Sequence, residues 1–197
     1  IIQIAGTNGK GSTAAMMAKI LGYAGYAVGL ATSPHLVEIN ERIRINGTSI
    51  GDESIEEFVQ YYKEDIERIS ASFFESVTAM GLWYFRKKNV DIAIMETGLG
   101  GRLDSVTVCN PILTIITPIS LDHTEILGNS IEKIAYEKAG IMKPGVPCVT
   151  AHQHENVYSV LQQHASTLNC ELIFAHGNIL RNTHPSLMGK YQFENAC

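Results

Sequence analysis

The sequence predicts an α/β fold with a doubly wound, mostly parallel β-sheet. Short apolar runs with the length of buried strands alternate along the chain with segments whose apolar residues recur at helical spacing. The runs 91–95 and 112–116 are almost entirely apolar, as expected for strands that helices cover on both faces. In such a fold ligands bind beyond the carboxyl ends of the strands, so the residues that follow each run are the candidates for function.

The beginning of the chain predicts a strand, a glycine-rich loop and a helix, and then two more strands. Residues 1–5 are an apolar run that leads into the loop of residues 6–13. Apolar side chains then fall at i, i+3, i+4 and i+7, at Ala14, Met17, Ala18 and Leu21. Residues 26–31 predict a buried strand, and 42–45 alternate like a half-exposed strand that ends at the Asn46-Gly47 turn.

Two helices and a regular alternation of elements are expected in the rest of the chain. Asp52 is expected to cap an amphipathic helix, whose apolar positions are Ile55, Phe58, Val59, Tyr62, Ile66 and Ile69. A second helix is expected over 74–88. The remaining elements are strands over 91–95, 112–116, 146–150 and 171–175 and helices over 130–139 and 155–168.

Polar residues follow four of the expected strands. They are residues 6–13, Thr32-Ser33, Glu96-Thr97 and Asp122-His123. Because the carboxyl ends of parallel strands lie along the same edge of a sheet, the fold should bring these clusters together on one rim.

The loop of residues 6–13 has the features of a phosphate-binding loop, like that of P-loop NTPases. Its glycines let backbone amides face a phosphate, the helix N-terminus adds a positive dipole, and Lys10 adds a full charge. The strict G-x-x-x-x-G-K-[ST] motif is not met, because Ile4 occupies the first glycine position and Gly11 separates Lys10 from Ser12. The candidate nucleotide-binding residues are Gly6, Thr7, Asn8, Gly9, Lys10, Gly11, Ser12 and Thr13.

Two other interpretations of this loop stay open at the level of the sequence. The first is a glycine-rich turn without a ligand. The second is a dinucleotide-binding turn, because residues 9–14 fit G-x-G-x-x-A. The next strand, however, ends in residues 30–33 without the acidic residue that would hold a ribose, and the lysine inside the loop favours a nucleoside triphosphate.

Four further side chains are candidates for metal binding or catalysis, each with a plain structural alternative. Glu96 could hold magnesium or be a solvated strand end. Arg102 could pair with a phosphate or be a surface charge, and His123 could bind a metal, orient a neighbour or be structural. Lys138 shares the apolar stripe of the 130–139 helix and so could point inward, unless it extends along that stripe to water.

The composition excludes several classes of partner. The net charge of −5, without a basic run, argues against nucleic acid and anionic membranes. The 4 cysteines are far apart, which favours reduced thiols and a cytoplasmic location. No apolar stretch is long enough to span a bilayer. The chain starts directly with a core strand and without an initiator Met, which indicates a fragment of a longer protein.

Ordered blocks over residues 2–150 carry a family resemblance. They are Ala-Gly-Thr-Asn-Gly-Lys-Gly-Ser at 5–12, Thr-Ser-Pro-His-Leu at 32–36, Asn-Glu-Arg-Ile at 40–43, Glu-Thr-Gly-Leu-Gly-Gly-Arg at 96–102, residues 121–128 beginning Leu-Asp-His, and Glu-Lys-Ala-Gly-Ile at 137–141. The chain thereby resembles the folylpolyglutamate synthase/dihydrofolate synthase family of the Mur ligase superfamily. Residues 189–196 resemble a further block of this family, one that contributes to its nucleotide pocket.

This resemblance implies an ATP-dependent amide-bond ligase that adds L-glutamate to the carboxylate of a folate or dihydropteroate through an acyl phosphate. Residues 1–197 would be the ATP-binding domain, of the kind at the centre of Mur ligases, and the C-terminal glutamate-binding domain would be absent from this chain. The expected protein is a cytoplasmic monomer that binds neither nucleic acid nor membranes.

The resemblance also implies roles for particular residues. Lys10 and its loop would grip the ATP phosphates, and Asn195 would approach the adenine. The implied ligands of two Mg²⁺ ions are Ser33 and Glu96 for one and His123 and Lys138 for the other, with Lys138 carbamylated by CO₂. Catalytic roles would fall to Lys10, His123 and Lys138.

Two departures from the family pattern and several alternatives remain. Val106-Thr107 stands where the family usually has Thr-Asn, and Tyr191 stands where histidine is usual. Ligases that add amino acids to the bacterial cell-wall precursor share the G-T-N-G-K loop, but residues 32–36 and 40–43 favour the folate branch. A P-loop kinase or regulator and a non-catalytic nucleotide-binding module are the other candidates, and reaction products would distinguish them.

Overall fold

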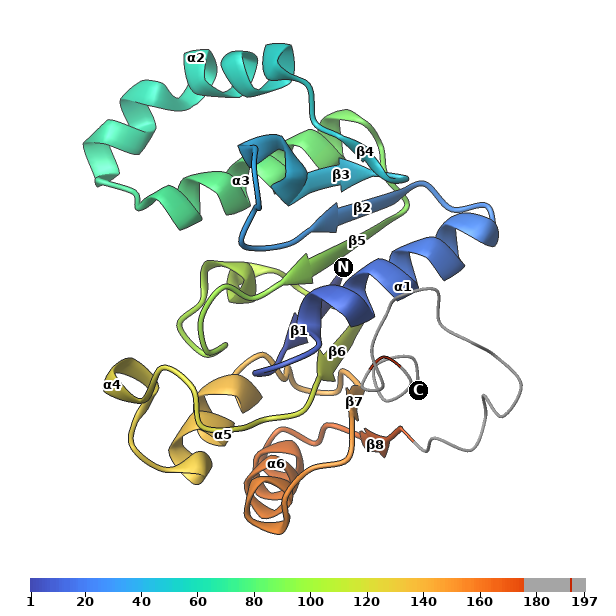
Figure 1. Ribbon diagram of the computed structural model, residues 1–197, viewed down its shortest axis with the longest axis vertical. Coiled ribbons are helices and arrows are strands. Elements are labelled where there is room, and N and C mark those ends of the chain that lie inside the picture. The colour runs from blue at the N-terminus through green and yellow to red at the C-terminus, as the bar shows by residue number, and fades with distance from the viewer. Residues whose placement is uncertain (176–191, 193–197) are drawn as a thin grey trace.

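The computed structural model describes residues 1–175 and Gln192, and its centre is an eight-stranded sheet (Figure 1). The strands are β1 Ile2–Ala5, β2 Val28–Ala31, β3 Ile43–Ile45, β4 Thr48–Ser49, β5 Ile92–Glu96, β6 Leu113–Ile116, β7 Cys148–Thr150 and β8 Leu172–Phe174. Their order across the sheet is β4-β3-β2-β5-β1-β6-β7-β8. All neighbours from β2 to β8 pair in parallel, and only β3 and β4 are antiparallel. The predicted doubly wound, mostly parallel sheet is confirmed.

Helices cover both faces of this sheet. They are α1 Lys10–Tyr23, α2 Asp52–Ile69, α3 Phe73–Lys87, α4 Thr124–Leu127, α5 Ile131–Ala139 and α6 Glu155–Thr167, with 3₁₀ helices η1 Ile39–Arg42 and η2 Ser105–Val108. Side chains alternate along each strand, so β1 turns Ile2 and Ile4 toward α1 and Ala5 toward the cluster beneath α5 and α6. Among the described helices, α1 packs on one face, while α3, α5 and α6 pack on the other.

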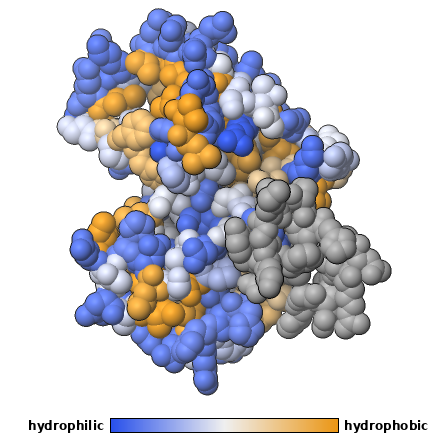
Figure 2. Space-filling model, viewed as in Figure 1, coloured by the Kyte–Doolittle hydropathy of each residue, from blue (hydrophilic) through white to orange (hydrophobic). Residues whose placement is uncertain are grey.

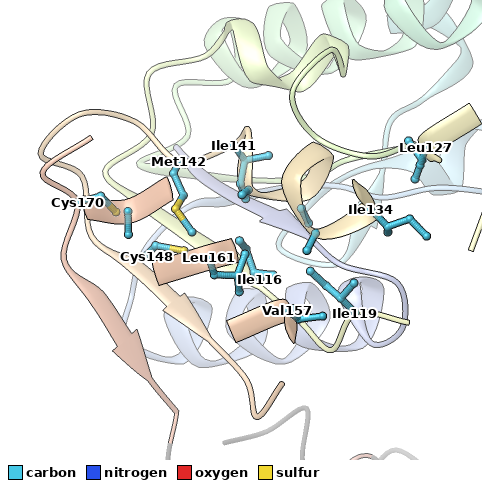
Figure 3. Packing of buried hydrophobic residues seen from close by; sticks show 14 residues of the cluster. Ile116, Ile119, Leu127, Ile134, Ile141, Met142, Cys148, Val157, Leu161 and Cys170 are labelled. Carbon is cyan, nitrogen blue, oxygen red and sulfur yellow. The ribbon is translucent and has the colours of Figure 1, made fainter. Parts of the chain in front are cut away.

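A dense apolar cluster fixes α5 and α6 against β6 and β7 (Figure 3). Ile116, Ile134, Ile141 and Leu161 in this cluster are fully buried. Removing each such side chain from water contributes about 1.5–3 kcal/mol, so the position of α5 beside the end of β1 is well determined. This packing matters for function because α5 carries Lys138.

The structure corrects one predicted helix boundary and adds elements that the sequence did not predict. Gly51, and not Asp52, precedes the long helix, and Asp52 is its first residue. The Asp52 carboxylate instead accepts a hydrogen bond of 2.7 Å from the Asn40 side chain and supplies negative charge to the first turn. Ser72 caps α3 in a capping box with Glu75. The unpredicted elements are β4, α4, η1 and η2, all of four residues or fewer.

No helix in the described part of the chain is both long and apolar enough to cross a membrane.

Candidate functional site

The glycine loop joins β1 to α1 and lies at the carboxyl edge of the sheet, as predicted (Figure 1). Gly9 has φ of 87°, a left-handed conformation that glycine adopts without strain. Gly6 has φ of 147°, and a Cβ atom there would lie 1.9 Å from the hydroxyl oxygen of Thr117. Two glycines of the motif are therefore required by backbone conformation and by the close approach of the segment after β6.

Hydrogen bonds tie the loop to residues 117–120, the segment that leaves β6. The amides of Thr7 and Asn8 donate to the carbonyl of Pro118 at 3.0 and 3.3 Å. The Thr7 hydroxyl donates to the Ser120 carbonyl at 3.1 Å and accepts from the Ser120 amide at 3.1 Å. The early part of the loop is thus held in one conformation, and the first-turn amides of α1, which have no partner inside the helix, begin immediately after it.

Lys10 and Lys138 meet at one carbonyl oxygen of this loop. Lys10 Nζ donates to the carbonyl oxygens of Gly6 and Thr7 at 3.1 and 3.2 Å. Lys138 Nζ donates to the same Gly6 oxygen at 2.8 Å. The two ammonium groups are brought together from the start of α1 and the last turn of α5, although they are far apart in the sequence.

The Lys138 side chain is buried, with only 3% of its surface exposed, so it does not extend to water. Burial, together with the nearby charge of Lys10, lowers the pKa of Lys138 to about 8, and the Asp122 carboxylate partly opposes this shift. A larger fraction of this lysine is therefore a neutral amine near neutral pH than of an exposed lysine.

Glu96 and Ser33 also meet at this rim. The Ser33 amide donates to Glu96 Oε2 at 3.1 Å. The Glu96 side chain is buried, and its burial raises the pKa of the carboxyl group, opposed by the Ser33 hydrogen bond and the charge of Lys10. A Cβ atom on Gly11 would lie 3.5 Å from Glu96 Oε2, so this carboxylate faces the N-terminus of α1 beside the phosphate loop.

The Asn40-Glu-Arg-Ile block shapes the turn that carries Ser33. The Glu41 carboxylate accepts hydrogen bonds of 2.9 Å from the amides of Leu36, Val37 and Glu38, and these bonds lower the pKa of Glu41 to about 2. Arg42 Nε donates to His35 Nδ1 at 2.7 Å. This block therefore organises residues 35–42 from within, a role that its sequence did not reveal.

His123 is more exposed than Lys10, Ser33, Glu96 and Lys138. More than half of its side chain is exposed, and it precedes α4 in a left-handed conformation with φ of 46°. Its Nε2 lies 3.6 Å from Asp122 Oδ1, whereas Lys138 donates to the Gly6 carbonyl. Within residues 1–175 and Gln192, no group of three or more His, Cys, Asp or Glu side chains could hold a metal ion.

The loop after β5 is closed by its own side chains. Asp104 Oδ2 accepts hydrogen bonds of 2.9 Å from the amides of Gly98 and Leu99. Arg102 forms an ion pair of 2.9 Å with Glu137, so it is paired within the protein. A Cβ atom on Gly140 would lie 2.3 Å from the Cβ of Arg102, so α5 and this loop can approach only because residue 140 is glycine.

The first departure from the family pattern is structural in this chain. Val106 is buried in the cluster beneath α3, and its carbonyl accepts a 2.7 Å hydrogen bond from Gln3. The Thr107 hydroxyl donates to the Gly101 carbonyl at 2.6 Å. Both residues therefore support the loop that carries Arg102. Tyr191 and the predicted adenine contact Asn195 lie outside the described residues.

A cleft of about 590 Å³ opens beside Ser33. Its lining includes residues of the first turn of α3, the loop after β5 and the α4–α5 region, and among them are Arg42, Phe74, Arg102 and Asp104. Figure 2 shows a hollow between the part formed by α2 and α3 and the part formed by α4 and α5. A molecule in this cleft would lie next to the rim that holds Glu96 and the phosphate loop.

Comparison with known proteins decides which family has this arrangement. The model of the Mur ligase middle domain matches residues 4–178. The chain belongs to the Mur ligase middle domain family. The matched residues include the end of β1 and all of β2 to β8.

Several relatives that this chain matches are named as folylpolyglutamate or dihydrofolate synthases. A dihydrofolate synthase/folylpolyglutamate synthase from Bacillus subtilis (strain 168) is 47% identical over 169 residues, which are 82% of this chain and 39% of that protein. A structure described as an FPGS–AMPPCP–folate complex is 37% identical with a TM-score of 0.84, over 88% of this chain and 44% of the other. Mycobacterium tuberculosis folylpolyglutamate synthase complexed with ADP is 31% identical with a TM-score of 0.91, over 99% and 51%. This chain therefore spans about half, or less, of the length of these relatives.

Proposed function

We propose that this chain is the nucleotide-binding part of an ATP-dependent ligase that joins L-glutamate to a folate or dihydropteroate carboxylate. The observation that carries the proposal is the convergence of Lys10, Lys138 and Glu96 on the glycine loop, beside an open cleft. The folate synthases at 47% and 37% identity support the choice of substrates.

The loop and Lys10 would hold the ATP phosphates. In the described conformation Lys10 donates to two carbonyl oxygens of its own loop, and in the complex we propose that it donates to phosphate oxygens instead. The γ-phosphoryl group passes to the acceptor carboxylate and forms an acyl phosphate, which the amino group of glutamate attacks as phosphate leaves. Such transfer depends on positioning and on neutralising charge, and it needs no nucleophile from the protein.

The residues at the rim fit one Mg²⁺ ion well. Glu96 supplies a carboxylate that already faces the loop, and Ser33 lies against it. One or two protein carboxylates together with phosphate oxygens are a usual environment for this ion. Magnesium at this place would neutralise charge on the phosphates during transfer.

A second ion does not fit Lys138 in the form described, because an ammonium group donates hydrogen bonds and has no lone pair for a metal. We propose that Lys138 is carbamylated in the active protein. Its neutral amine adds to CO₂, a nitrogen–carbon bond forms, and the proton goes to solvent. The resulting carboxylate, together with His123, would supply ligands for the second Mg²⁺, and the lowered pKa of Lys138 supports this reaction.

The cleft beside Ser33 is the proposed site of the folate or dihydropteroate. Phe74 supplies an aromatic surface, and Arg42 supplies positive charge for a substrate that carries a carboxylate, whereas Arg102 is already paired with Glu137. We propose that glutamate is held by a domain outside this chain, because the relatives are about twice as long or longer. We also propose a cytoplasmic monomer, and the buried free thiols of Cys109, Cys148 and Cys170 are compatible with a reducing compartment.

The deciding experiment measures products. The complete protein is incubated with ATP, Mg²⁺ and labelled glutamate, with dihydropteroate or tetrahydrofolate as the acceptor. Release of ADP that depends on both acceptor and glutamate, with label in the acceptor, is expected. Incorporation with a cell-wall precursor alone would indicate the other amino-acid ligases, transfer of phosphate to a stable acceptor would indicate a kinase, and binding without turnover would indicate a binding module.

A further inference from the structure

Residues 117–120, which we call the rim segment, form one wall of the phosphate loop. Their carbonyl and amide groups bond to Thr7 and Asn8, and Thr117 packs directly against Gly6. The rim segment also leads into Asp122 and His123. Whatever fixes this segment therefore fixes the position of the loop.

Gln153 holds the rim segment from the side opposite the loop. Its Nε2 donates to the Thr117 carbonyl at 3.1 Å, and its Oε1 accepts from the Ile119 amide at 3.0 Å. The same Nε2 donates to the Thr150 hydroxyl at 3.1 Å. Both the oxygen and the nitrogen of this carboxamide therefore bond to the rim segment, and the nitrogen also bonds to Thr150 at the end of β7.

The elements behind Gln153 give it a rigid base. Thr150 is fully buried at the end of β7, and its hydroxyl donates to the Ile116 carbonyl of β6 at 3.3 Å. His154 follows Gln153 and caps α6, which is anchored by the fully buried Val157 and Leu161 (Figure 3). Alanine would lose all three hydrogen bonds of the side chain, and glutamate would place an oxygen where the Thr117 carbonyl needs a donor.

We infer that Gln153 is a positioning residue for nucleotide binding: it fixes the rim segment and thereby holds Thr7 and Asn8 in the conformation that presents the start of α1 to the phosphates. The inference rests on the proposed function to the extent that the glycine loop binds a nucleotide. It does not depend on which acceptor is used or on glutamate.

The test compares Gln153→Ala and Gln153→Glu with Leu161→Val, a variant that trims the same α6 region without removing a hydrogen bond. Binding of Mg-AMPPCP to the complete protein is followed by calorimetric titration, and amide hydrogen exchange is measured at Thr7, Asn8 and Ser120. Loss of the Gln153 bonds is expected to weaken nucleotide binding about tenfold and to speed exchange at these amides by a similar factor. Leu161→Val is expected to lower the melting temperature while changing neither quantity by more than about twofold.

A purely structural role for Gln153 predicts a different result. In that case all variants with equal loss of melting temperature would bind the nucleotide equally well, and this result would overturn the inference. Gln153→Glu preserves side-chain volume, so it provides the answer if Gln153→Ala does not fold. If the unaltered complete protein binds nucleotide and its Gln153→Ala variant does not, but the unaltered protein incorporates no glutamate, only the ligase assignment falls. Absence of nucleotide binding by the unaltered complete protein would overturn both.

Discussion

Lys10 is the residue whose loss should separate function from folding most clearly. Its ammonium group donates to the loop carbonyls of Gly6 and Thr7, and within the described residues it takes no part in the apolar clusters. We expect Lys10→Ala in the complete protein to lower ATP turnover by about 100-fold or more, with an unchanged melting temperature. Lys19→Ala, which removes another lysine of the same helix, should leave turnover unchanged. Normal turnover in Lys10→Ala would refute the phosphate-loop assignment.

We expect the buried charge of Lys138 to lower the free energy of unfolding. The pKa of Lys138 in the folded protein is about 8, below its ordinary value of 10.5. Below pH 8 the lysine is therefore charged in both the folded and the unfolded protein, and the full free-energy cost of burying that charge destabilises the fold. Between pH 8 and 10.5 the folded protein releases the proton first, and stability rises. Lys138→Met should therefore raise the free energy of unfolding by up to about 3 kcal/mol below pH 8.

This gain should shrink as the pH rises toward 10.5, and it should be accompanied by loss of turnover. The measurement is denaturant unfolding of both proteins in CO₂-free buffer from pH 6 to 10.5, because the difference between them cancels the other titrating groups. Equal stability of the two proteins at every pH would show that the ammonium group reaches water.

At the scale of elements, the contact between α5 and the loop after β5 sets the position of Lys138. Gly140 allows this contact because it has no Cβ atom; a Cβ there would lie 2.3 Å from the Cβ of Arg102. Gly140→Ala should push α5 away and destabilise the protein by about 1–3 kcal/mol. Gly22→Ala is the matched control: near the end of α1, where a Cβ meets nothing closer than 4.0 Å, alanine should stabilise by about 0.5–1 kcal/mol. Chemical denaturation measures both, and equal effects of the two substitutions would contradict the account.

Local sequence predicted most of the elements because periodicity and length separate buried strands from amphipathic helices. It also predicted that residues 6–13, Ser33 and Glu96 would meet, since strand ends in a parallel sheet share an edge. The place of Lys138 beside them was implied only by the family resemblance, while helical spacing predicted that it could point inward. Short pieces such as α4 and β4 escaped prediction because four residues or fewer carry too little pattern. The boundary at Asp52 was wrong because an acidic residue is favourable both as a cap and in the first turn.

Contacts that depend on the register between distant segments could not be predicted. Asp104 closes its own loop, and Gln153 holds the rim segment; nothing in the residues around either one indicates these partners. The exposed position of His123 also follows from the turn before α4, and no helical or strand periodicity covers that turn. The roles proposed for His123 and for carbamylated Lys138 stay predictions.

At the scale of the whole molecule, the rim is open on the side of the cleft (Figure 2). We expect the 197-residue chain alone to bind Mg-ATP weakly at best and to form no glutamate-extended folate, because the proposed site would lie between this domain and another. Titration with nucleotide and chromatography of the folate products would test this. Label in the folate fraction with the chain alone would show that one domain suffices.

We propose that the Gly6 carbonyl stands in for a phosphate oxygen. In the described conformation it accepts hydrogen bonds from both Lys10 and Lys138, so Lys10 would bind a nucleotide by exchanging one acceptor for another. The affinity that an experiment records is then a difference between the new contacts and the old ones. Strong bonds between Lys10 and the carbonyls of its own loop would therefore lower the affinity for the nucleotide and speed the departure of ADP, which favours turnover.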